Sequence, residues 1–489
     1  MNDRQGDEQA TPEELSLPSV SAERLDVPPS APPSSQSSVS ERIAPAAQLG
    51  RGSLRQRAVR ASAWVVMGML ATQALRFASN IILAQLLLPA HFGIMLIVNV
   101  VLQGMRMFSD VGIRGSIVSS QAGDQERFLN TAWTIQVIRG VGLWLLICLL
   151  AWPVARFYEE PILTQVLPVI GLIMIFYGLS STATLTLTRH VQFGRQVGVQ
   201  LVGQTLGIVI MVAWAWLWPS VWAFVAGGIF QVAFQCVASY RLIPGYRNRF
   251  MWDADAAKQI FHFGKWIFVC TALQFFLMSG DKAVLGKVFT TSEVGVFAIA
   301  VLLCESLLQI LRRLSHEVLL PVYARLSETG DRRHFRVKTM QMRSVLLAIS
   351  LPPLWLLAVF GQPIVTLLYP ERYAGAGPML QWLAIGAVGT VVSMTAERVT
   401  LARGDSFRAT VVQAVRSVLL IGAMLAGFKL AGPIGVLVGA AVAHIVDYPV
   451  TVWSIHRYDA WLPWLDLSAY LISAIVIATG IIIFNQSPF

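Results

Sequence analysis

Residues 61–85 read ASAWVVMGMLATQALRFASNIILAQ, a run of mostly apolar residues interrupted by a few polar side chains. A helix of about 20 such residues crosses the roughly 30 Å hydrocarbon layer of a membrane, so this stretch is long enough to span one. Its polar residues Gln73, Arg76 and Asn80 fall within about 60° of each other at about 100° per residue. The stretch therefore predicts a membrane-spanning helix with one polar face.

The rest of the chain repeats this pattern. Of its 489 residues, 55% are hydrophobic and 13% are charged, whereas soluble domains carry about 25% charged residues. This composition excludes a water-soluble protein of this size, and we predict an all-α polytopic membrane protein. The predicted spans are 61–85, 92–117, 130–153, 164–188, 197–218, 220–242, 260–285, 294–320, 341–361, 376–401, 408–430, 433–456 and 468–485.

The basic residues predict the orientation of these spans. The net charge of +10 does not indicate nucleic-acid binding, because Lys and Arg lie in short gaps between apolar blocks. They concentrate in alternate loops, among which we count Arg343, so the positive-inside rule places the N-terminus in the cytoplasm. An odd number of spans then places Phe489 on the opposite, periplasmic side.

The spans divide into two halves with an additional helix. We predict an N-terminal lobe of six helices over 58–243, a cytoplasmic linker over 244–259, a C-terminal lobe of six helices over 260–457 and an extra helix over 458–489. Two such halves are typical of transporters with a substrate site between related lobes. Residues 1–55 are rich in Pro and Ser, and we expect a disordered cytoplasmic tail there.

Polar faces recur on equivalent helices of the two halves, the first and second and the seventh and eighth. A charge in mid-membrane costs at least about 2.5–3.5 kcal/mol, so each requires a reason. We expect these faces to line a central, water-accessible cavity. They comprise Gln73, Arg76 and Asn80; Asn99, Gln103, Arg106, Asp110 and Arg114; Gln274, Asp281 and Lys282; and Glu305, Gln309, Arg312 and His316, while Arg139, Ser393, Glu397 and Thr400 add to them from spans three and ten.

Cations exceed anions within the spans, which favours an anionic ligand, because guanidinium groups suit phosphate oxygens. The predicted substrate-binding residues are Gln73, Arg76, Arg106, Arg139, Lys282, Gln309, Arg312 and His316, and the ion-coupling candidates are Asp110, Asp281, Glu305 and Glu397. The alternative is that these charges form internal salt bridges between or along helices, for example Arg106 with Asp110 or Glu305 with Arg312.

Other motifs give no support for catalysis. The run GDKAVLGKV at 280–288 lacks the spacing and the final Ser or Thr of a phosphate loop. His316 and Glu317 lack the second His of a zinc-protease motif, and Leu320 occupies its position. All four cysteines fall within predicted spans and favour packing roles. We therefore expect neither metal nor cofactor, and transport driven by a proton or sodium gradient or by substrate supply.

Four short stretches together resemble a known family. They are ILAQLLLPAHFG at 82–93, FSDVG at 108–112, GDKAVLG at 280–286 followed by VGVFA at 294–298, and PVYARL at 321–326. In order and spacing they are similar to the polysaccharide transporter (oligosaccharide flippase) family of the multidrug/oligosaccharidyl-lipid/polysaccharide (MOP) exporter superfamily, over about residues 55–457. The resemblance implies a V-shaped twelve-helix core, from which the tail and the extra helix depart.

The resemblance also implies a function: alternating access that moves undecaprenyl-pyrophosphate-linked oligosaccharide units across the bacterial inner membrane. Cationic cavity residues, here Arg76, Arg106, Arg139, Lys282 and Arg312, would meet the pyrophosphate and sugar. Expected partners are the lipid-linked oligosaccharide, membrane lipids and polymerase or export machinery, with no nucleic acid. Two alternatives remain open: a drug or peptidoglycan-precursor exporter of the same superfamily, and a membrane polymerase or ligase. The short outward loops leave little room for the latter.

Overall fold

The structure is a computed structural model. It describes residues 54–109, 113, 116–117, 125–182, 184–185, 193–242, 248–261, 275, 285–315, 319, 322–323, 332–403, 405–458 and 460–484. The predicted tail lies almost wholly outside these residues, and so does the predicted span 260–285 except at its two ends and at Phe275.

The first half of the described chain contains six helices, which are apolar along most of their length. They are α2 (Leu54–Leu86), α3 (Pro89–Phe108), α5 (Glu126–Tyr158), α6 (Leu163–Leu179), α8 (Phe193–Leu217) and α9 (Trp222–Ser239). α3 begins at Pro89, whose missing N–H costs nothing in the first turn of a helix. The C-cap of α5 is Glu159, which adopts a left-handed conformation with φ of 59° and turns the chain towards α6.

The second half contains six helices of unequal length whose two ends are both described, and one 3₁₀ turn. They are α11 (Thr291–Leu314), α13 (Arg332–Leu368), η3 (Glu371–Tyr373), α14 (Ala376–Ala402), α15 (Ser406–Val446), α16 (Tyr448–His456) and α17 (Pro463–Phe484). Thr290 and Glu293 form a capping box that fixes the start of α11. The helical geometry of α15 breaks at Ala431 and at Gly432, whose φ is 62°, directly before Pro433.

These helices confirm the predicted class of fold. Within the described residues, 10 helical segments are long and apolar enough to cross a membrane, and α6 is a shorter apolar helix. The segment Phe407–His456 holds two of the predicted spans, which meet at the break in α15. Every predicted span other than 260–285 therefore overlaps a described helix. Most boundaries shift by a few residues, but α3 ends at Phe108, α6 ends at Leu179 and α13 begins at Arg332, each nine residues from the predicted boundary.

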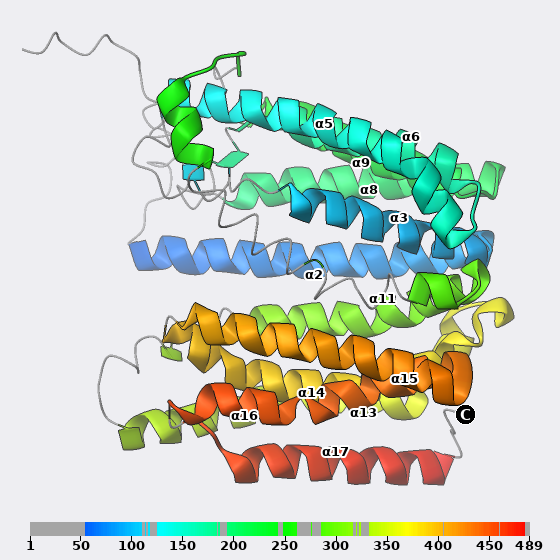
Figure 1. Ribbon diagram of the computed structural model, residues 1–489, viewed down its shortest axis with the longest axis vertical. Coiled ribbons are helices and arrows are strands. Elements are labelled where there is room, and N and C mark those ends of the chain that lie inside the picture. Colours follow the sequence, from blue (N-terminus) through cyan, green and yellow to red (C-terminus); the bar gives the residue numbers. More distant parts are fainter. Residues whose placement is uncertain are drawn as a thin grey trace, which may run out of the picture. The chain divides into compact units, whose positions relative to one another are not determined.

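The helices run side by side in two sets (Figure 1). In the first set α5 packs on α6, α8 on α9 and α2 on α8; in the second, α14 packs on α11, α13, α15 and α16. The extra helix α17 packs on α13 and α14 and lies at the edge of the second set (Figure 1). The main contact between the sets joins α3 to α11.

Glycines permit the close crossing of α3 and α11. A Cβ atom at Gly295 would overlap the carbonyl oxygen of Pro89, and one at Gly93 would overlap that of Thr291. The two helix backbones therefore touch, as small residues allow in membrane proteins. The contact lies at the N-terminal ends of both helices.

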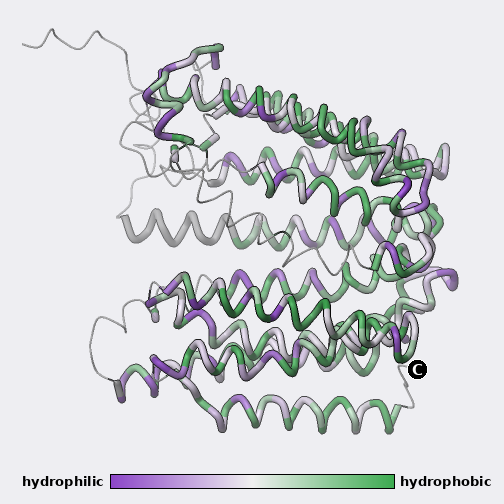
Figure 2. The backbone as a smooth tube through the Cα atoms, in the orientation of Figure 1, coloured by the Kyte–Doolittle hydropathy of each residue, from purple (hydrophilic) through white to green (hydrophobic). Residues whose placement is uncertain are grey.

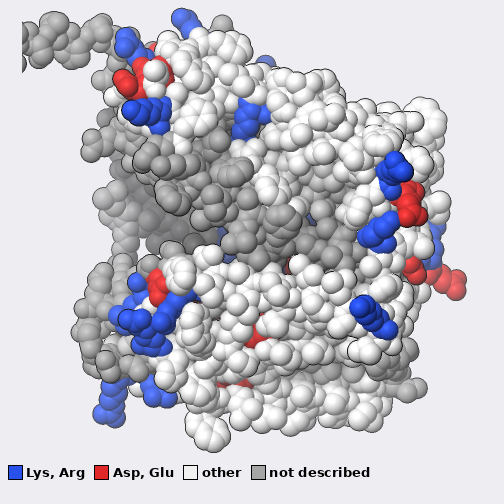
Figure 3. Space-filling view, in the orientation of Figure 1, with Lys and Arg blue, Asp and Glu red and all other residues white. Residues whose placement is uncertain are grey.

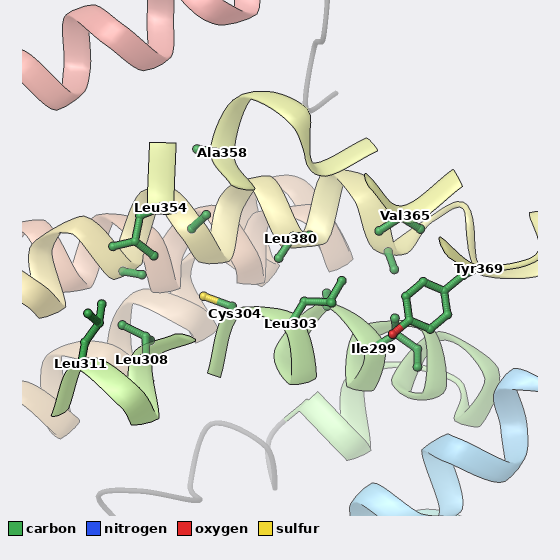
Figure 4. Close-up of a cluster of buried hydrophobic side chains, with 14 of the residues drawn as sticks. Ile299, Leu303, Cys304, Leu308, Leu311, Leu354, Ala358, Val365, Tyr369 and Leu380 are labelled. Atoms are coloured by element: carbon green, nitrogen blue, oxygen red, sulfur yellow. The ribbon is translucent and has the colours of Figure 1, made fainter. Parts of the chain in front are cut away.

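Apolar side chains fill the interior of the second set. Figure 4 shows Leu303 and Leu308 of α11 with Leu354 of α13 and Leu380 of α14, all of them buried. Hydrophobic residues run along much of the length of the helices (Figure 2), and many large apolar side chains are exposed. Most charges on the face in Figure 3 gather near the two ends of the helices. A band with few charges between charged ends is the surface expected of a protein embedded in lipid.

Candidate functional site

The polar faces of α2 and α11 meet in the structure. The Gln73 Nε2 amide donates a hydrogen bond to the Gln309 Oε1 at 3.0 Å. One turn along α2, the Arg76 side chain is exposed, and only its backbone carbonyl is engaged, accepting a 2.7 Å hydrogen bond from Asn80. No hydrogen bond or ion pair joins the Arg76 guanidinium to another residue that the structure describes. Arg76 is thus a bare cation beside an inter-helix amide contact.

Two further predicted cations lie together on α3 and α5. The Arg139 Nε donates to the Ser109 Oγ at 3.1 Å, and its Nη2 donates to the Arg106 carbonyl at 3.4 Å. The Arg106 guanidinium lies 6.0 Å from the ring centre of Tyr177, at the limit of a cation–π contact. The predicted alternative, a pair between Arg106 and Asp110, lies outside the described residues.

On α11 the salt-bridge alternative holds for one pair. The Arg312 Nη2 lies 2.7 Å from the Glu305 Oε2, and the two side chains are 34% and 33% exposed. These residues are seven apart and therefore share one face of the helix. The Arg312 Nε remains buried without a hydrogen-bond partner. Arg312 is thus partly neutralised in this conformation, in contrast to Arg76.

Glu397 is also paired. The Arg416 Nη2 lies 2.5 Å from the Glu397 Oε1, and the Arg416 Nε bonds to Asp447. Thr451 accepts a further 3.0 Å bond from Arg416, and Ser393 donates to Asp447 at 3.4 Å. One guanidinium therefore holds carboxylates from α14 and from the end of α15. The sequence placed Glu397 among the ion-coupling candidates but did not identify this cluster.

A fully buried ion pair joins α13 to α17, and the sequence did not predict it. The Arg343 Nη2 lies 2.5 Å from the Asp466 Oδ1, and both side chains are 0% exposed. Arg343 also donates to Thr395 at 3.3 Å, and Tyr448 donates to Asp466 at 2.8 Å. We counted Arg343 as a cytoplasmic loop residue, which is wrong, because α13 begins at Arg332 and carries position 343 into the protein. The pair links the extra helix α17 to α13.

Four predicted site residues cannot be placed. Lys282, His316, Asp110 and Asp281 all lie outside the residues that the structure describes. The described part of the site therefore consists of Gln73, Arg76, Arg106 and Arg139 in the first set of helices and Glu305, Gln309, Arg312 and Glu397 in the second.

Polar contacts also join the two sets near the start of α11, a region that we name the α11 joint. It comprises Glu159, Glu160, Lys287, Thr291 and Arg372. Lys287 Nζ lies 2.6 Å from the Glu159 Oε1, and the side chains are 44% and 80% exposed. The hydrogen bond from Lys287, together with its charge, lowers the pKa of Glu159. Thr291 hydrogen-bonds to Glu160.

Arg372 reaches from η3 to the C-terminal end of α2. Its Nη2 donates to the carbonyl oxygens of Ala84 at 2.8 Å and Gln85 at 2.7 Å. These carbonyls belong to the last turn of α2, where a helix carries partial negative charge. Beside it, the buried Tyr373 hydroxyl donates to the Leu87 carbonyl at 2.8 Å. The joint thus holds the first set of helices against the second near the start of α11.

The apolar helices lie side by side, enclose polar residues and form two sets that are joined through α3 and α11. This arrangement defines a multi-pass membrane protein. Known structures agree with this class. The inward closed lipid II flippase MurJ matches with a TM-score of 0.65 at 12% identity, covering 88% of this chain and 98% of that one. An inward-facing multidrug resistance MATE transporter of the MOP superfamily matches with a TM-score of 0.56 at 12% identity, covering 85% and 98%. The fold is that of the MOP superfamily.

The particular family follows from the sequence comparison. Residues 82–378 match the polysaccharide biosynthesis protein family, and the chain belongs to this family. It is 23% identical to the succinoglycan biosynthesis transport protein ExoT of Rhizobium meliloti, over 66% of this chain and 64% of that protein. It is 21% identical to the lipopolysaccharide biosynthesis protein WzxC of Escherichia coli, over 89% and 90%. The match to the first relative thus spans slightly less than two thirds of its length.

Proposed function

We propose that this chain is a flippase that moves undecaprenyl-pyrophosphate-linked oligosaccharide units across the bacterial inner membrane, with its N-terminus in the cytoplasm. Membership of a polysaccharide biosynthesis family supports the pathway class. One relative is named as a transport protein, and a similar solved structure is a lipid II flippase. The proposal makes the protein a transporter with no chemistry of its own.

The observation that carries the proposal is the Arg76 guanidinium, which no hydrogen bond or ion pair joins to another residue that the structure describes. A fully ionised guanidinium with free N–H donors in a membrane helix is costly unless water or an anion contacts it. Its planar fork matches two phosphate oxygens, whereas a cationic drug would be repelled. Arg106 and Arg139 on the same set of helices would extend this anion-binding site towards the sugar.

Alternating access would involve the two sets moving about their contacts. We take the lobes as 58–243 and 260–457, joined by the linker 244–259, with 458–489 attached to the second. In the present conformation the α11 joint is closed. Opening the site on that side would require the Glu159–Lys287 pair to separate, which costs little free energy because water screens the charges of an exposed ion pair.

The test is a deletion strain complemented with Arg76→Ala, Arg76→Lys or wild type. We expect Arg76→Ala to retain the protein in the membrane, lose polymer at least about tenfold and trap complete lipid-linked units on the cytoplasmic leaflet, because two N–H contacts to phosphate are lost. Arg76→Lys should restore part of the export, since a point charge replaces the fork. Arg156→Ala, which removes a cation stacked on Trp152 at the end of α5, is the matched control.

Other outcomes would contradict the proposal. Normal export by Arg76→Ala would show that Arg76 does not bind the substrate. Units that reach the periplasm in the deletion strain but remain unjoined would favour a polymerase or ligase. Unchanged lipid pools and unchanged polymer in the deletion strain would favour the drug-exporter alternative.

A further inference from the structure

An apolar groove lies between α8 and α9. It has a volume of about 290 Å³ and is lined by Val199, Phe234, Val237, Ala238, Arg241 and Leu242. Only one of these residues is charged, and it lies just beyond the last residue of α9. The groove therefore has an apolar floor and one basic end. None of its lining residues belongs to α2, α3 or α11, which carry the proposed substrate site.

The exposed face of α8 indicates that lipid contacts this region. Arg195, Val202, Val209 and Trp216 recur every seven residues, which places them along one face. Val202 is 50% exposed, Val209 57% and Trp216 74%. The 21 residue-to-residue steps from Arg195 to Trp216 extend about 31 Å at about 1.5 Å each, close to the hydrocarbon thickness. An apolar face ending in Arg and Trp is typical of a helix surface that meets lipid.

A second arginine lies at the basic end of the groove. Arg195 precedes the lining residue Val199 by one helical turn and so lies on the same side of α8. α9 packs alongside α8, and Arg241 therefore lies at the same end of this helical hairpin as Arg195. Both arginines are exposed, and no ion pair joins either one to a residue that the structure describes. A Cβ atom added at Gly198 would meet nothing within 4 Å, so the surface beside Arg195 is open.

We infer that this groove binds one anionic phospholipid of the surrounding membrane. An acyl chain lies along Val199, Phe234 and Val237, and the phosphate lies between the guanidinium groups of Arg195 and Arg241. The apolar lining would accept any acyl chain, so the two arginines supply the preference for negative charge. This site differs from the proposed substrate site, and its test needs neither the oligosaccharide nor transport activity.

The experiment is native mass spectrometry of the purified full-length protein, titrated with phosphatidylglycerol or phosphatidylethanolamine of identical acyl chains. One phosphatidylglycerol should bind in preference to phosphatidylethanolamine. Arg195→Gln and Arg241→Gln should each weaken that binding roughly fivefold, and the double variant roughly thirtyfold, with phosphatidylethanolamine unchanged. Ala238→Phe should block both lipids by filling the groove. Arg249→Gln, an exposed cation outside the lining, is the matched control.

Three results would overturn the inference: equal binding of the two lipids by wild type, undiminished phosphatidylglycerol binding by the double variant, or displacement of the bound lipid by equimolar undecaprenyl phosphate. The last would assign the groove to the substrate's own lipid. Melting temperatures in lipid-free detergent check that each variant is folded. If the double variant does not fold, the two single variants decide the question.

Discussion

Substitution of Asp466 by Asn tests how the extra helix is attached. The two residues have nearly the same size, so the change removes charge and leaves the volume intact. In the wild type, Asp466 accepts from Arg343 at 2.5 Å and from Tyr448 at 2.8 Å, and its side chain is 0% exposed. After the change, the amide oxygen at position 466 can still accept a hydrogen bond, but the Arg343 guanidinium is left with neutral partners alone among the described residues, which also include Thr395 and the carbonyl of Val392.

The magnitude follows from burial. Removal of one partner from a buried pair costs about 3–5 kcal/mol, because the remaining charge is uncompensated. An exposed pair such as Lys287–Glu159, with side chains 44% and 80% exposed, contributes far less, because water screens both charges. The Arg343 Nη1 already has no hydrogen-bond partner, so the site has no spare contact for the orphaned cation. We expect Asp466→Asn to lower the free energy of unfolding by about 3–5 kcal/mol.

The assay is unfolding of the purified protein by sodium dodecyl sulfate in mixed micelles, followed by circular dichroism. The control is Asp255→Asn, an exposed carboxylate, which should be within about 0.5 kcal/mol of wild type. The double variant Arg343→Met, Asp466→Leu should recover most of the loss, because it replaces the buried pair by apolar residues and leaves no uncompensated charge. A loss below about 1 kcal/mol for Asp466→Asn, or a double variant no better than the single one, would refute the reasoning.

Three further predictions follow from close contacts. Gly295→Ala should lower thermal stability, since the new methyl overlaps the Pro89 carbonyl; an unchanged melting temperature would contradict the α3–α11 crossing. Arg416→Gln should cost about 3–5 kcal/mol in the same unfolding assay by leaving two carboxylates unpaired, with Arg416→Lys intermediate. Because its pKa is lowered in the folded protein, Glu159 stabilises the α11 joint above its unfolded pKa of about 4.3 and loses that effect only below it. Hydrogen exchange at 285–290, corrected for intrinsic rates, should therefore be constant from about pH 8 to 5.5.

The sequence could predict the helices because each signal is local. A run of about 20 apolar residues and a charged or Pro/Gly boundary lie within one window of chain. The break in α15 at Gly432, before Pro433, falls in the short gap between the predicted spans 408–430 and 433–456. The Arg343 error has a local cause too: basic residues crowd the start of α13, and the positive-inside rule treats such a cluster as a loop.

The polar contacts could be predicted only where both partners share one helix. Glu305 and Arg312 are seven residues apart, so helical periodicity alone places them on one face. The Arg416 cluster draws on three helices, and its formation depends on their mutual rotation and depth, which periodicity does not supply. The buried pair Arg343–Asp466 joins positions 123 residues apart. Each of the two residues does carry a charge beside an apolar run, which marks it as a candidate for a buried ion pair. No local pattern, however, shows that these two residues are partners.

The distribution of these pairs has a consequence for how the protein would work. In the described part of the second set, Arg312, Arg343 and Arg416 each bind a carboxylate, so the charges there stabilise helix packing. In the first set, Arg76 has no carboxylate partner among the described residues, and Arg106 contacts an aromatic ring. Packed pairs resist rearrangement, whereas a bare guanidinium gains most from an incoming anion. An anionic head group would therefore engage the first set before the second, and Arg312 could join it only by releasing Glu305.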